Sequence, residues 1–199
     1  MLDPRQADAL PGEIDPALRS DAAHTTAAAI VHRGRAAGDP ELVDRLVRLV
    51  EAEGLDLIAA LWADSAPETL PGALWRLYVL REWVRRDPVT VADRYRLGVA
   101  AAPVHDAVAG VVSPPGPDDV REVADAVLSG VYAGDLAVAL ERGAAFCRVL
   151  ATGAAFDADH LDALDPGGAA RLTRGAAALV RTASELEQAA GLWRHDALE

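Results

Sequence analysis

The stretch Leu74–Arg86, LWRLYVLREWVRR, contains three aromatic side chains and four arginines, and its position decides how the rest of the chain packs. An α-helix turns by roughly 100° per residue, so its residues can be assigned to faces. One narrow apolar face carries Ala73, Leu77, Leu80 and Val84. The aromatic side chains cover most of the remaining surface, and the arginines are spread around the axis. Because a helix that is apolar nearly all round is buried by its neighbours, we predict that this one lies centrally, with its arginine ends reaching water or acidic partners.

The composition of the chain favours helices throughout. Of its 199 residues, 51% are hydrophobic but only 5% are aromatic, so Ala, Val and Leu supply much of the apolar surface. These residues suit close-packed helices better than a sheet, and beyond short stretches no alternation of period two competes with the helical pattern. We expect an all-α fold of about seven to eight helices in a compact orthogonal or bundle-like arrangement, with a central aromatic-arginine helix and a long C-terminal helix.

Helix boundaries follow from apolar spacing and from capping residues. Asp39 and Asp87 each precede a proline at the first helical position, where proline is tolerated, and the segment 113–117, SPPGP, is the clearest break. We expect residues 1–19 to form a loosely ordered arm and residues 20–199 to form a single helical domain, which the break could divide into two sets of helices. The predicted helices span about 21–37, 40–53, 55–65, 70–86, 88–102, 118–131, 135–152 and 166–193.

Arginine supplies all of the strong positive charge. The chain has 19 basic residues, none of them lysine, against 31 acidic ones. Arginine must therefore fill the surface roles that lysine shares elsewhere, and the net charge of −12 argues against a general affinity for nucleic acid or an anionic membrane. Residues 76–98 nevertheless carry a local basic excess. Two interpretations stay open: arginines paired with an acidic shell, or an anion or small-molecule site that uses Arg81, Arg85, Arg94 and Arg96.

The predicted C-terminal helix carries a heptad pattern. Leucine and alanine alternate at spacings of four and three residues from position 172 to position 193, which would let a partner helix approach closely. The partner is either another helix of the same bundle or the same helix of a second copy in a homodimer. The residues of such a dimer seam are Leu172, Leu179, Leu186 and Trp193.

The segment 89–110 invites comparison with a helix-turn-helix, because Gly98 and its apolar neighbours resemble the turn of that motif. The comparison then fails. Asp93 and Arg94 stand where the motif needs apolar and small side chains, and Pro103 would break the recognition helix. A DNA-binding regulator is therefore the third alternative for function.

Motifs for metal binding and catalysis are missing or weak. His24 and His32 are eight residues apart and cannot chelate one ion by themselves. The segment 156–165 is rich in aspartate but lacks the glycine and the final glutamate of an EF-hand loop, so helix capping explains it better. Neither a nucleophile elbow nor a phosphate-binding loop occurs, and Cys147 lies on the apolar face of its helix, as a buried thiol would. We expect no cofactor and no metal, and the sequence leans away from an enzyme.

Three segments resemble a family of all-helical proteins from high-GC bacteria that has no assigned activity. They are LPGALWRLYVLREWVRRDP at 70–88, SPPGP at 113–117 and GDLAVALERGAAFCRVLATG at 134–153. The resemblance covers about residues 24–153 and carries no catalytic motif, so it implies a helical fold and no residue roles.

The leading prediction for function is a non-enzymatic regulatory or protein-interaction module that acts through a helical surface, and one form of it is a homodimer through the C-terminal helix. The alternative is a protein that binds a small molecule or a phosphate ligand, with or without catalysis, through the arginines of 76–96. The expected partner is protein, either a second copy or another chain, rather than nucleic acid or a membrane. The N-terminus has no basic and apolar signal pattern, and no apolar run is long enough to span a bilayer, so we expect a cytoplasmic location.

Overall fold

The computed structural model describes residues 16–31, 55–110, 118–119, 121–122, 125 and 135–199. Within these ranges the chain forms helices and turns and no strand, which confirms the predicted all-α class. The described helices for which both ends are defined are α2 (Pro16–Val31), α4 (Leu55–Trp62), α5 (Leu70–Arg86), α6 (Pro88–Val99), α7 (Pro103–Ala109), α9 (Leu136–Leu161) and α10 (Pro166–Arg194).

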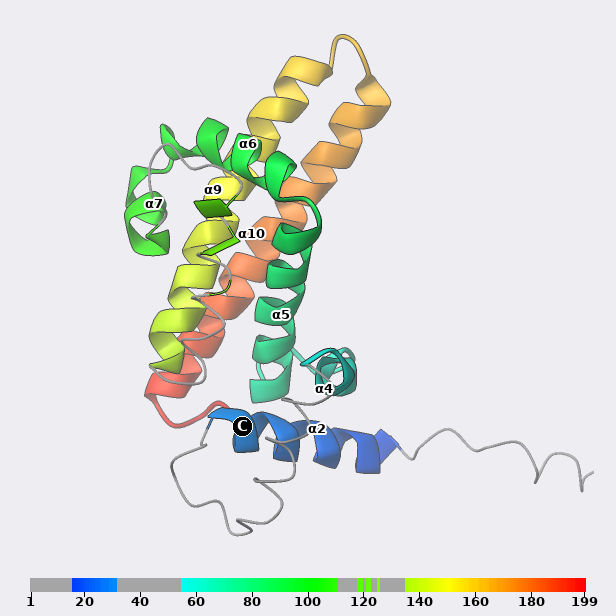
Figure 1. Cartoon of the computed structure of the whole chain (residues 1–199), viewed down its shortest axis with the longest axis vertical. Helices are drawn as coiled ribbons and strands as arrows, with labels where there is room; N and C mark the ends of the chain where they lie inside the picture. The colour runs from blue at the N-terminus through cyan, green and yellow to red at the C-terminus, as the bar shows by residue number, and fades with distance from the viewer. Residues whose placement is uncertain (1–15, 32–54, 111–117, 120, 123–124, 126–134) are drawn as a thin grey trace, which may run out of the picture.

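The two longest helices of the described residues, α9 and α10, form an antiparallel hairpin, and α5, α6 and α7 pack against it (Figure 1). Its turn is tight because Asp165 caps α10: the carboxylate accepts a hydrogen bond from the Gly168 N–H at 2.9 Å, and Pro166 occupies the first helical position. Where α10 faces the core, Ala183 and Leu186 are completely buried. The small side chains between the leucines let the two backbones approach closely.

Two ion pairs join the polar edges of this hairpin. Arg148 Nη2 donates to Glu187 Oε2 at 2.5 Å, and Arg194 Nη2 donates to Glu141 Oε2 at 2.8 Å. In each pair the hydrogen bond from the arginine lowers the pKa of the glutamate below its usual value. Both carboxylates are therefore more strongly held as anions in the folded chain than in the unfolded one.

α6 meets α9 at a contact made by two glycines. A Cβ atom on Gly98 would lie 2.0 Å from the carbonyl oxygen of Val149, and one on Gly153 would lie 1.8 Å from the carbonyl oxygen of Arg94. The two backbones can approach this closely only because neither position has a side chain. The contact holds Arg94 of α6 at a fixed place beside α9.

α5, the predicted aromatic-arginine helix, connects the hairpin to the N-terminal helices. It packs against α2, α4, α6, α9 and α10 (Figure 1), and its predicted apolar face is buried. Thr69 caps its first turn by accepting from the Gly72 N–H at 3.2 Å, and Asp87 ends it and caps α6 by accepting from the Thr90 N–H at 3.3 Å. The prediction that this helix lies inside the fold is confirmed, although α9 buries more of its surface.

The N-terminal helices and the C-terminal residues close the end of the bundle beneath α5. The buried indole of Trp62 on α4 donates to Thr26 Oγ1 on α2 at 3.1 Å, which satisfies the one polar atom of that side chain. Leu198 is buried nearby, and the Leu70 N–H at the start of α5 donates to the carbonyl oxygen of Glu199 at 2.6 Å. Figure 1 accordingly places the C-terminus beside α2.

Several predicted boundaries differ from the structure. α2 begins at Pro16, within the predicted arm, and α9 continues nine residues past the predicted end at 152, so the segment 156–161 is helical rather than a loop. α6 ends at Val99, and Pro103 begins the separate helix α7, as expected of a residue that starts helices better than it continues them. The predicted helix at 40–53, the break at 113–117 and most of the helix at 118–131 lie outside the described residues.

Candidate functional site

Three arginines of α5 have acidic partners. Arg76 Nε donates to Glu185 of α10 at 2.5 Å. Arg81 Nε donates to Asp125 at 2.6 Å, and Arg85 lies 3.6 Å from the same carboxylate. These side chains are therefore distributed over the surface of α5 in ion pairs and do not surround a cavity together.

The two predicted arginines of α6 lie in different environments although only one residue separates them. Arg96 is exposed and pairs with Asp93 one turn earlier. Arg94 is mostly buried beside α9, and its Nε lies 3.5 Å from Asp157. The four predicted contacts Arg81, Arg85, Arg94 and Arg96 are thus not assembled into one site, and Arg94 lines a cavity that none of the other three lines.

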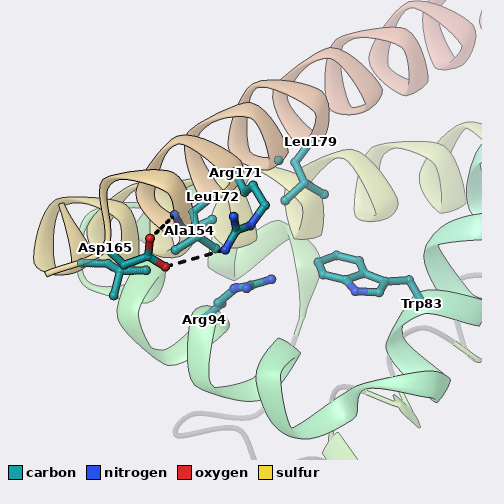
Figure 2. Close-up of a pocket in the computed structure, with 10 residues that line it drawn as sticks. Trp83, Arg94, Ala154, Asp165, Arg171, Leu172 and Leu179 are labelled. Atoms are coloured by element: carbon teal, nitrogen blue, oxygen red, sulfur yellow. Dashed lines mark hydrogen bonds and ion pairs between the residues drawn. The ribbon is translucent and has the colours of Figure 1, made fainter.

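This cavity, which we call the arginine cavity, has a volume of about 660 Å³ and opens between α5, α6, α9 and α10. Figure 2 shows Arg94 of α6 and Arg171 of α10 extending toward the same space, with the Trp83 ring of α5 directed at it from the side. Its lining residues are Trp83, Arg94, Ala154, Leu161, Asp165, Gly168, Arg171, Leu172, Gly175 and Leu179.

Arg94 carries a buried donor without an acceptor. Its Nε is buried and has no hydrogen-bond partner among the described residues. The Asp157 carboxylate lies 3.5 Å away, which is longer than an ordinary hydrogen bond. A buried donor left unsatisfied costs about 1–3 kcal/mol. The packing of α6 on α9 therefore holds the guanidinium of Arg94 at a place where the fold does not supply all of its hydrogen-bond acceptors.

Arg171 is the second cation of the cavity, and its carboxylate partner is also distant. Asp165 Oδ2 lies 3.7 Å from Arg171 Nη2 (Figure 2), while the other oxygen of Asp165 accepts from the Gly168 N–H and caps α10. Elsewhere in the described chain, Arg76 and Arg148 reach their carboxylates at 2.5 Å. The two cavity arginines are thus paired more weakly than the arginines that hold helices together.

Local sequence explains why the cavity exists. On α10, Gly168 and Gly175 stand on the same face as Leu172 and Leu179, and the equivalent positions in the following heptads hold Thr182 and Ala189. A Cβ atom on Gly175 would have no heavy atom within 4 Å. A Cβ atom on Gly168, by contrast, would lie 2.3 Å from Asp165 Oδ2 and 2.7 Å from Leu161 Cδ2. The missing side chain of Gly175 therefore leaves space on this face of α10, and the glycine contact of α6 with α9 holds Arg94 beside it.

A second cavity, which we call the apolar cavity, adjoins the first along α5 and α10. It has a volume of about 370 Å³, and Trp83 and Leu179 line both cavities. Its lining residues are Ala63, Ser65, Trp75, Arg76, Val79, Leu80, Trp83, Cys147, Leu179, Thr182 and Glu185. Burial raises the pKa of the Cys147 thiol to about 12, so this side chain is the inert hydrophobic residue that its sequence position predicts.

The predicted dimer seam is occupied within the chain. Leu186 is completely buried, and Leu179 and Trp193 pack against the same core, which includes the facing residues of α9. Leu172 is half-buried at the arginine cavity. Much of the heptad face of α10 is therefore covered by α9 of the same chain, as in the interpretation of packing within one bundle. The homodimer through Leu172, Leu179, Leu186 and Trp193 stays a prediction.

Sequence reasoning missed Arg171 and Trp83 as site residues. Trp83 was assigned to the covering surface of α5, and Arg171 lies beside a heptad face that seemed complete. The signal that could have identified them is Gly175, which leaves a gap between Leu172 and Leu179 on an apolar face of the helix. In the described part of the chain no group of three or more His, Cys, Asp or Glu residues is arranged to hold a metal ion.

Comparisons with known proteins give no evidence on function, so the geometry of the arginine cavity is the evidence that remains. No protein-family model, curated protein or solved structure matches the chain. Among the described helices, none has the length and apolar character needed to cross a membrane.

Proposed function

We propose that this protein binds a small organic anion, with a carboxylate or phosphate group, in the arginine cavity. The observation that carries the proposal is the buried Nε of Arg94, a cationic donor without an acceptor in the wall of an open cavity. An anionic oxygen in the cavity would accept from the Arg94 guanidinium, a cation that has no hydrogen bond to the fold through its buried Nε.

The charges around the cavity support an anion. Arg94 and Arg171 extend toward the same space (Figure 2), and their carboxylate partners lie 3.5 and 3.7 Å away. A ligand oxygen can approach to about 2.8 Å and accept from a planar guanidinium in a bidentate manner. Two like charges with distant partners therefore favour an anion between them.

The remaining walls support an organic ligand over an inorganic ion. Trp83, Leu161, Leu172 and Leu179 provide apolar surface, and the volume of about 660 Å³ falls within the roughly 300–1,000 Å³ of small-molecule sites. Sites of this kind combine apolar walls with a few polar groups that orient the ligand. Arg94 and Arg171 would hold the anionic group, and the Trp83 ring would pack against the body of the ligand.

This proposal replaces the interaction module as the leading interpretation because of the surfaces involved. A homodimer through α10 needs a free heptad face, and Leu186 is completely buried against the rest of its own chain. A nucleic-acid surface needs arginines along one accessible track, while those of α5 are paired with Glu185 and Asp125. The ligand-binding alternative, by contrast, keeps one of its predicted residues, Arg94, in an open cavity.

A thermal-shift experiment with benzoate, hexanoate and phosphate tests the proposal. A ligand that binds the folded state raises the melting temperature as its concentration passes the dissociation constant. We expect benzoate and hexanoate to raise it in a saturable manner, and phosphate to do so less, because phosphate leaves the apolar walls uncovered.

Two glycines of α10 supply a matched pair of variants. A Cβ atom on Gly175 or on Gly191 would meet nothing within 4 Å, so neither G175L nor G191L introduces a backbone clash. Only Gly175 lines the arginine cavity, where a leucine side chain would occupy the ligand space. We expect G175L to abolish the shift and G191L to keep it. Equal shifts in both variants, or no shift with any of the three anions, would rule out the proposed site.

A further inference from the structure

The arginine cavity and the apolar cavity are neighbours rather than separate sites. The Trp83 ring and Leu179 line the arginine cavity and also line the apolar cavity. One side of both is α5 and the other is α10, so the pair forms a groove between these two helices. Arg94 and Arg171, whose carboxylate partners lie 3.5 and 3.7 Å away, line its first half.

The second half of the groove differs chemically from the first. Its walls near Trp83 are apolar: Trp75, Val79, Leu80 and Cys147. At its far end Arg76 and Glu185 are paired with each other at 2.5 Å, so both charges there are already neutralised. From Trp83 to Trp75 the groove follows α5 for about 12 Å, at 1.5 Å of rise per residue.

We propose that the anion bound by this protein is an alkyl carboxylate whose chain passes Trp83 and Leu179 and enters the apolar cavity. The proposal rests on the function proposed above and names the ligand class. The carboxylate accepts from Arg94 and Arg171, and the hydrocarbon covers the Trp83 ring and the wall formed by Val79 and Leu80. The apolar cavity is about half the volume of the arginine cavity, which suits one chain.

Chain length is the variable that tests this assignment. Isothermal titration with butyrate, hexanoate, octanoate and dodecanoate, each below its micelle concentration, measures the affinity for one head group on four chains. Burial of each further methylene strengthens binding roughly fourfold. We expect the affinity to rise steeply from butyrate to dodecanoate, and uncharged dodecanol to bind much more weakly because it offers nothing to the two arginines.

A variant of the apolar cavity separates this inference from the proposed function. Thr182 lines the apolar cavity and not the arginine cavity, so T182W fills the path of the chain and leaves the arginines unchanged. V79W fills the same cavity from the exposed side of α5 and serves if T182W does not fold. In either variant we expect dodecanoate to lose at least tenfold in affinity, while butyrate and hexanoate bind as they do to the unmodified protein.

The outcomes are distinguishable. If short carboxylates bind but the affinity does not depend on chain length, or if T182W and V79W weaken dodecanoate and hexanoate alike, the alkyl-chain inference is wrong while the anion site stands. If no carboxylate binds, both proposals fail. If dodecanol binds as tightly as dodecanoate, the arginines do not select the ligand. If anionic phospholipid vesicles bind the protein and free dodecanoate does not, a membrane lipid rather than a free carboxylate occupies the groove.

Discussion

The arginines of α5 and the arginines of the cavity have the same chemistry and opposite surroundings. Arg76 and Arg81 reach carboxylates at 2.5 and 2.6 Å and connect α5 to other parts of the chain. Arg94 and Arg171 have carboxylates only at 3.5 and 3.7 Å, and one nitrogen of Arg94 is buried without a partner. In a chain whose 19 basic residues are all arginine, the composition of a segment therefore says little about binding. What distinguishes a site is how completely the fold satisfies each guanidinium.

The largest expected effect on stability comes from disrupting the glycine contact between α6 and α9, which positions Arg94. In G153A the new Cβ atom would lie 1.8 Å from the carbonyl oxygen of Arg94, so α6 must separate from α9. We expect a loss of about 3 kcal/mol in the free energy of unfolding, measured by urea denaturation. G191A, on a helix position with open space, is the control and should be neutral or up to about 1 kcal/mol more stable. Equal stabilities would mean that the close approach of α6 and α9 is not needed.

Two variants compare how much an arginine of α5 and an arginine of the cavity contribute to the free energy of unfolding. Arg76 donates to Glu185 and to the Gly72 carbonyl, so R76A should lose about 1–2 kcal/mol in the absence of any ligand. R94L removes an unsatisfied donor and keeps most of the side-chain volume, so its unfolding free energy should be unchanged or higher by up to about 3 kcal/mol. Urea denaturation of both variants checks this order. A larger loss in R94L than in R76A would show that Arg94 stabilises the fold.

The pH dependence of the free energy of unfolding tests an ion pair that joins α9 and α10. A hydrogen bond from Arg148 lowers the folded-state pKa of Glu187. The pair therefore stabilises the fold fully above the unfolded glutamate pKa of about 4.3, and this contribution is lost as the pH falls through the lower folded-state value. We expect the stability difference between the unmodified protein and E187Q to be largest near pH 7 and to vanish toward pH 3. E68Q, which changes an exposed carboxylate, should show no such trend.

The smallest expected effect concerns the wall of the apolar cavity. Burial raises the pKa of Cys147 to about 12, so less than about one thiol in a thousand is ionised at pH 8. We expect a thiol-specific disulfide reagent to label the folded protein very slowly and the urea-unfolded protein at once. Rapid labelling of the folded protein would indicate that the apolar cavity opens readily to solvent.

Much of the fold could be predicted because its signals are local. The apolar face of α5, the cap formed by Asp87 and the extent of α10 follow from residues within a few positions of one another. The end of α9 could not be predicted in this way. The predicted helix stops at 152, directly before Gly153, whereas the structure uses this glycine in mid-helix to admit the backbone of α6.

The candidate site was less predictable because it depends on contacts between distant segments. Arg94 and Arg171 are 77 positions apart in the sequence and meet only through the packing of α6 and α10 on α9. Heptad spacing in α10 predicts an apolar partner, but it cannot distinguish a helix of the same chain from that of a second copy. The location of that partner is a property of the whole bundle.

The central claim is that Arg94 faces a binding cavity whereas its neighbour Arg96 does not, and one titration tests it most directly. R94L and R96L remove the same charge from the same helix, but only Arg94 lines the arginine cavity, whereas Arg96 is exposed beside Asp93. In isothermal titration with hexanoate, the account predicts at least a tenfold loss of affinity in R94L, since a charge-assisted hydrogen bond contributes about 1.5–3 kcal/mol, and less than a twofold change in R96L. Equal affinities in the two variants would contradict it.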